Sequence, residues 1–128
     1  MNLRDIIPKH KLDFDSINKL KAHDKDALRP IVPDLLMWLQ DINWPIASEI
    51  SDILLQFDKE LFPYIREVLH SDDSLWKYSI LIKIIDRMAP TDKFELKQDL
   101  EKLSNNPDLN DKEEGIDEIS KEILQSLY

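Results

Sequence analysis

The stretch DSLWKYSILIKIIDRM, residues 73–88, predicts a helix that is apolar around most of its circumference. A helix without a polar stripe is usually buried among its neighbours. The β-branched run would also suit a strand, but the length of the stretch and the lack of flanking strands favour a helix. We therefore expect residues 75–85 to form the most buried helix, and Ile82→Asp to destabilise the protein severely.

The segments on either side of this stretch predict amphipathic helices. Each of them places apolar residues at the i, i+3, i+4, i+7 spacing of one helical face. These segments cover residues 14–23, 31–41, 44–57, 60–70, 94–103 and 113–127. Together with the buried stretch they predict an all-α fold of about seven helices joined by short links.

Side chains that cap helices mark several of the expected helix starts. Asn43 precedes Trp44 and Pro45, and Asp73 or Ser74 precedes the buried stretch. Asp111 is followed three residues later by Glu114, which is the spacing of a capping box. We therefore expect helices to begin just after Asn43, Asp73 and Asp111.

Length and composition indicate a globular domain. A chain of 128 residues predicts one domain, residues 1–128, and 42% hydrophobic with 34% charged residues is typical of a folded protein. Gly115 is the only glycine, which excludes glycine-rich phosphate loops. The absence of cysteine, of a signal-like N-terminal run and of a long apolar segment predicts a cytoplasmic protein away from membranes.

The net charge of −9 restricts the class of partner. Nucleic acid would be repelled on average, and the lysines and arginines are interleaved with acidic residues and form no basic stripe. A basic protein partner is electrostatically easier to bind. The plainer interpretation is that an acidic surface only keeps the protein soluble.

The two predicted helix starts that contain tryptophan resemble each other in sequence and form a repeat. The stretch DINWPIASEISDILLQF, residues 41–57, aligns with residues 73–88, so that Asp41 matches Asp73 and Trp44 matches Trp76 at an offset of 32 residues. A third copy opens at Asp111. Helix pairs that repeat at 20–50 residues predict a solenoid of stacked hairpins.

The stretches LLMWLQDINWPIA (35–47), YIREVL (64–69), DDSLWKYSIL (72–81) and EEGIDEISKEIL (113–124) together resemble one small bacterial family of unknown function that is related to HEAT repeats. The resemblance covers nearly the whole chain. It implies an all-α superhelix and no particular activity. The recurring positions of the family fall here on Trp38, Gln40, Asp41, Asn43, Trp44, Pro45, Arg66, Trp76, Lys77, Tyr78, Glu114, Gly115 and Asp117.

In a solenoid the first helices of successive pairs begin at one edge, and this geometry predicts a binding patch. The candidate residues are Trp38, Asp41, Asn43, Trp44, Arg66, Asp73, Trp76, Lys77, Tyr78, Glu114 and Asp117. Aromatic rings beside carboxylates are suited to recognition. In the competing interpretation Asn43 caps a helix and the tryptophans only pack. We expect Trp38 to be mainly structural, and Trp44 and Trp76 to be half-buried with their indole N–H groups toward the edge.

The pattern predicts no catalytic residue, metal or cofactor. Glutamates and aspartates between 113 and 122 recur at helical spacing, but no histidine accompanies them, and a solvated helix face explains them better. The three histidines match no metal-ligand spacing. No nucleophile motif of the G-x-S-x-G kind occurs.

The sequence therefore predicts a protein-binding module, in its sharper form an inhibitor or immunity-type protein that masks a basic partner. The alternative is a HEAT-like enzyme that processes nucleic acid, such as a base-excision glycosylase. Its candidate residues would be Trp38, Asp41, Arg66 and Trp76. A continuous positive groove beside Trp44 and Trp76 would favour the enzyme.

Overall fold

The computed structural model describes residues 2–128, and within them every regular element is helical. The α-helices are α1 (Phe14–Lys21), α2 (Lys25–Leu28), α3 (Val32–Leu36), α4 (Ala47–Leu55), α5 (Phe62–Leu69), α6 (Ser74–Lys83), α7 (Pro90–Glu95), α8 (Lys97–Asn105), α9 (Leu109–Glu113) and α10 (Ile116–Gln125). Short 3₁₀ turns cover Leu3–Ile6, Arg29–Ile31, Met37–Leu39, Asp58–Leu61 and Ile85–Arg87. The all-α prediction is confirmed. The elements outnumber the seven expected because the 3₁₀ turns and short helices divide the predicted segments.

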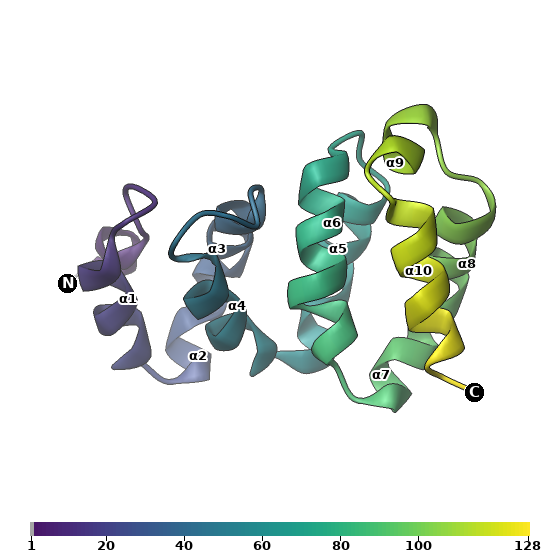
Figure 1. The fold of residues 1–128 in the computed structure, drawn as a ribbon. Helices are drawn as coiled ribbons and strands as arrows, with labels where there is room; N and C mark the ends of the chain where they lie inside the picture. Colours follow the sequence, from purple (N-terminus) through teal and green to yellow (C-terminus); the bar gives the residue numbers. More distant parts are fainter. Residues whose placement is uncertain (1) are drawn as a thin grey trace.

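The helices lie side by side in chain order, from α1 at the left of Figure 1 to α8 and α10 at the right. The links that precede α4, α6 and α10 all lie along the top in this view, whereas α7 lies at the bottom. We call the region formed by residues 40–46, 70–75 and 106–114 the upper edge. It collects chain segments that are about one helix pair apart in the sequence.

Ion pairs connect each helix pair to the next. Among residues 2–128, eight of them join residues that are 28 to 36 positions apart, among them Arg4–Asp34, Arg29–Glu60, Lys59–Glu95, Arg66–Asp99 and Arg87–Asp52. Most of these pairs are exposed to solvent, which screens their charges, so each of them adds little to stability. They show which segments of the chain lie next to each other more than they stabilise the fold.

One cluster of buried apolar side chains extends from Ile6 to Ile123. The stretch at 73–88 contributes to it through α6 and the 3₁₀ turn that follows, where Ile80, Leu81, Ile84 and Ile85 have no exposed surface. Other positions of this stretch are not buried, since Leu75 is 57% exposed and Ile82 is partly exposed. Ile82 is therefore not one of the fully buried positions on which the prediction of a severe loss for Ile82→Asp depends. Helix α6 ends at Lys83, and the chain then tightens into a 3₁₀ turn. This change from α-helix to 3₁₀ turn places Ile84 and Ile85 in the core.

One of the three predicted caps is confirmed and two are wrong. The Asp73 carboxylate accepts a hydrogen bond from the Trp76 backbone N–H, so Asp73 caps α6. Asn43 caps no helix, because α4 begins only at Ala47 and Ile46 occupies its N-cap position. The Asp41 side chain accepts the Asn43 backbone N–H at 2.8 Å and closes a turn before the helix. Helix α4 consequently begins at Ala47, five residues later than the repeat offset from Ser74 would place it.

The third predicted cap, Asp111, lies inside α9 and is buried. Asp108 caps α9 in its place and accepts the Asp111 backbone N–H at 2.8 Å. Helix α10 starts after Gly115, whose φ of 74° lies in the left-handed region that favours glycine. The capping-box spacing therefore occurs here by coincidence, and the single glycine separates two helices.

Asp13 is expected to stabilise α1 in a pH-dependent way. Its carboxylate accepts the backbone N–H groups of Lys9 and Ser16. The Lys9 hydrogen bond is the main reason that the pKa of Asp13 falls from 3.8 to about 2. Because the folded-state pKa is lowered, the stabilisation is complete above the unfolded-state pKa and is lost as the pH falls toward the folded-state value.

Asp13→Ala is therefore expected to lower the free energy of unfolding by about 1 kcal/mol at neutral pH, as measured by urea denaturation. The difference from wild type should shrink as the pH falls from about 4 to about 2. Asp15→Ala is the control, since Asp15 is exposed and does not cap the helix. A loss that is equal for both variants and constant with pH would contradict this role of Asp13.

Candidate binding surface

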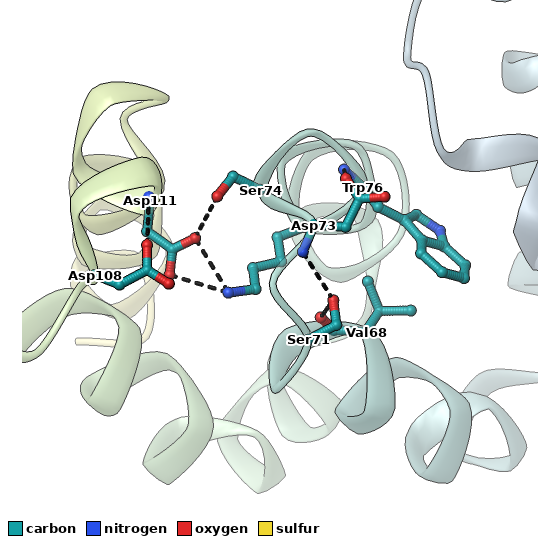
Figure 2. A network of polar contacts seen from close by, with 8 residues as sticks. Val68, Ser71, Asp73, Ser74, Trp76, Asp108 and Asp111 are labelled. Carbon is teal, nitrogen blue, oxygen red and sulfur yellow. Dashed lines mark hydrogen bonds and ion pairs between the residues drawn. The ribbon is translucent and has the colours of Figure 1, made fainter.

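A buried ion pair lies directly beneath the upper edge. The ammonium nitrogen of Lys77 lies 3.1 and 3.0 Å from the two carboxylate oxygens of Asp111, and each side chain is only 4% exposed. The Ser74 hydroxyl donates to the same carboxylate at 2.7 Å. Figure 2 shows Ser74 on α6 and Asp111 on α9 turned toward each other, with Asp108 beside them. These contacts hold α9 against the first turn of α6.

Lys77 was predicted to contact a partner, and its burial assigns it a different role. Its charge is neutralised by Asp111, and the pair is removed from solvent. Breaking such a pair leaves an uncompensated buried charge, whereas the intact pair positions the elements that carry it. Lys77 therefore builds the upper edge and is not part of its exposed surface.

Trp76 points away from this ion pair, toward α3 and α5. In Figure 2 its ring extends to the side opposite Asp111, with Val68 close below. The indole N–H donates to the Leu36 carbonyl at 3.1 Å. The prediction that this N–H faces the edge was therefore wrong. The ring is half-buried, as expected, and this hydrogen bond fixes its orientation.

The ring of Trp76 forms one wall of a cavity of about 240 Å³, which we call the Trp76 hollow. Its lining residues are Pro33, Leu36, Tyr64, Glu67, Val68, Ser71 and Trp76. The floor is apolar, because Leu36 and Val68 are buried. Glu67 is the only charged lining residue and is exposed.

The other two tryptophans form a separate hollow of about 220 Å³ at the preceding helix pair. The rings of Trp38 and Trp44 lie 5.4 Å apart between centroids and are tilted by 59°. Both are partly exposed, and Met37 beside them is 52% exposed. The lining residues are Ile7, Asp34, Met37, Trp38, Gln40 and Trp44. Trp38 therefore packs against the buried core and also lines this exposed hollow.

The upper edge itself is acidic. Asp72, Asp73 and Glu114 line one open hollow together with Ser74, Leu75 and Asn110, so the structure brings two predicted residues, Asp73 and Glu114, together. Among residues 2–128 these three carboxylates form no ion pair, and all three side chains are exposed. Their charges are therefore available to a partner.

The remaining predicted residues lie apart from this hollow. Arg66 pairs with Asp99 at 3.2 Å and lies over the ring of Phe62. Tyr78 is half-buried against the core, and Asn43 is exposed in the link before α4. Asp117, in the first turn of α10, keeps one carboxylate oxygen buried without a hydrogen-bond partner.

The residues proposed for a glycosylase do not share a cavity. Trp38 lines the hollow at Trp44, Trp76 lines its own hollow, and neither Asp41 nor Arg66 lines either of them. Both hollows contain a carboxylate and neither is lined by lysine or arginine. Neither of these two hollows is the positive groove that would favour the enzymatic alternative.

Two features of this surface were missed by sequence reasoning. Tyr64 and Glu67 complete the Trp76 hollow, but the predicted patch included only Arg66 from α5. The buried pairing of Asp111 with Lys77 joins residues that are 34 positions apart, so the local spacing of Asp111 and Glu114 predicts only a cap. No helix within residues 2–128 is long and apolar enough to cross a membrane, and these residues hold no group of three metal-ligating side chains.

The fold and this surface define an all-helical protein with an acidic edge and two shallow aromatic hollows. Comparison with known families assigns it more closely. The chain belongs to the family described as domain of unknown function DUF5071, which it matches over residues 6–124. No curated protein matches the chain.

Proposed function

We propose that this protein binds another protein through its upper edge, and that the partner presents a basic segment. The observation that carries the proposal is that the exposed carboxylates of Asp72, Asp73 and Glu114 line one open hollow and form no ion pair among residues 2–128. The half-buried ring of Trp76 lines a second hollow that Ser71, the residue before Asp72, also lines. Carboxylates steer a cationic partner, and an aromatic ring supplies contact area at low entropic cost. The net charge of −9 acts in the same direction.

The finer proposal is a HEAT-like binder that works in the cytoplasm as an inhibitor or immunity-type protein and masks a basic effector. It is supported by ion pairs that link residues 28 to 36 positions apart, which is the spacing expected of stacked helix pairs. The absence of cysteine fits a reducing compartment. Stacked pairs give an extended surface, which suits covering a partner better than enclosing a substrate.

The test is capture of partner proteins from the native host with the immobilised protein. The proposal predicts that a protein with a basic segment is retained, and that retention falls as the salt concentration rises. The triple variant Asp72→Asn/Asp73→Asn/Glu114→Gln should lose this retention. Asparagine at position 73 keeps an N-cap, so α6 should remain intact.

A matched control carries the same change of charge elsewhere. Asp15→Asn/Glu118→Gln/Glu122→Gln also removes three exposed carboxylates, but from α1 and α10 outside the upper edge. This variant should retain the partner as well as wild type does. Equal loss for both triple variants would contradict a specific edge and would indicate a response to net charge alone.

A further inference from the structure

We propose that the Trp76 hollow accepts one arginine side chain from the basic segment of the partner. The inference rests on the proposed function, because it names the group that the partner inserts beside the upper edge. Ser71, at the end of the hollow, is followed directly by Asp72 and Asp73 of the edge. The hollow and the acidic edge are therefore continuous along the chain.

The walls of the hollow are aromatic and are fixed before any ligand arrives. The Trp76 indole N–H is held by the Leu36 carbonyl at 3.1 Å, and the Trp76 backbone N–H is held by Asp73 at 3.0 Å. Tyr64 supplies a second half-buried ring, and Val68 a buried floor. A site whose rings are already held loses little conformational entropy on binding.

The charge of the hollow selects a cation. Glu67 is exposed and forms no ion pair with any residue that the structure describes. The Ser71 hydroxyl donates to the Val68 carbonyl at 2.7 Å and its oxygen accepts the Asp73 backbone N–H at 3.3 Å, so Ser71 is already engaged within the protein. No lysine, arginine or histidine lines the cavity, so the ligand would bring the positive charge that pairs with Glu67.

Size and shape favour the guanidinium group. A cavity of about 240 Å³ is below the range of about 300–1,000 Å³ for drug-sized ligands, and it suits a single side chain. Arginine is planar, stacks on aromatic rings and donates two parallel hydrogen bonds to a carboxylate. Lysine is compact and strongly hydrated, and it would use the two rings less well. Basic residues on either side of the arginine would face Asp72 and Asp73.

The test uses the full chain, labelled with ¹⁵N, and three blocked peptides as probes. These are acetyl-Gly-Ser-Arg-Ser-Gly-amide and the same peptide with citrulline or lysine in place of arginine. Citrulline keeps the shape of arginine without its charge. The indole N–H signals report on the three tryptophans, and Trp76→Phe assigns the signal of Trp76.

The arginine peptide should shift the Trp76 indole signal in a saturable way and leave the signals of Trp38 and Trp44 in place. Its affinity should exceed those of the citrulline and lysine peptides by about tenfold, which corresponds to one charge-assisted contact. Glu67→Gln should weaken arginine binding by about tenfold, whereas Glu122→Gln should leave it unchanged. Both substitutions lie on exposed side chains, so the folded helix content should remain that of wild type.

Equal affinity for arginine and citrulline, or for arginine and lysine, would overturn the inference. So would a shift confined to Trp38 and Trp44, or no Trp76 shift at a peptide concentration of about 10 mM. The peptides contain no partner protein, so this failure is distinct from failure of the proposed function. If retention of the partner depends on Asp72 and Asp73 but the arginine peptide does not bind, the results support binding through the upper edge and contradict arginine binding in the Trp76 hollow.

Discussion

Lys77→Met is expected to lower the free energy of unfolding by about 3–5 kcal/mol, measured by urea denaturation. The Asp111 carboxylate is only 4% exposed, and without the ammonium group of Lys77 it would keep the Ser74 hydroxyl as its one side-chain hydrogen-bond donor among residues 2–128. Burying an unpaired charge is among the few mechanisms that produce a loss of this size. Lys112→Met is the matched control, because Lys112 is exposed and should change stability by less than about 0.5 kcal/mol.

A triple variant separates the cost of an orphaned charge from simple loss of packing. Ser74→Ala/Lys77→Met/Asp111→Leu removes all three polar side chains and refills the space with apolar atoms of similar size. Replacing a buried ion pair in this way is often neutral or stabilising, so stability should return to within about 1 kcal/mol of wild type. A triple variant as unstable as Lys77→Met would show that packing, and not charge, governs this site.

Ile80→Asp is expected to have an even larger effect and to abolish cooperative folding or cost more than about 4 kcal/mol. Ile80 has no exposed surface, so an aspartate there would place its charge in the apolar core. Thermal unfolding followed by circular dichroism would measure the loss.

Ile82→Asp is the internal comparison, since it makes the same chemical change two residues later at a partly exposed position. Its carboxylate can reach water, so the expected cost is about 1–2 kcal/mol. Similar losses at both positions would contradict an α6 that exposes Ile82 in part and buries Ile80.

The local sequence predicted the helices because their apolar spacing is a property of each segment alone. Helices α1, α5, α8 and α10 all begin and end within or close to the ranges that the spacing indicated. The cap at Asp73 was equally predictable, since the capping hydrogen bond spans only three residues. The links were less predictable, because in each of them several side chains compete for the same backbone donors.

The candidate site depended on contacts that no local pattern contains. The local sequence predicts an exposed charge at Lys77, because the Asp111 carboxylate that pairs with it lies 34 residues further along the chain. The Trp76 hollow requires α3 and α5 as well as α6, so Glu67 could not be selected from the tryptophan repeat. Tertiary packing therefore determines both the burial of Lys77 and the set of residues that line the Trp76 hollow.

Site-specific photo-crosslinking tests the binding edge most directly. Leu75 and Phe94 are 57% and 54% exposed, but Leu75 lies on the upper edge and Phe94 on α7 at the opposite edge (Figure 1). With p-benzoylphenylalanine placed at either position in the native host, position 75 should form a covalent adduct with a protein that carries a basic segment, and position 94 should not. Adducts at position 94 alone, equal adducts at both positions, or none at position 75 would contradict binding through the upper edge.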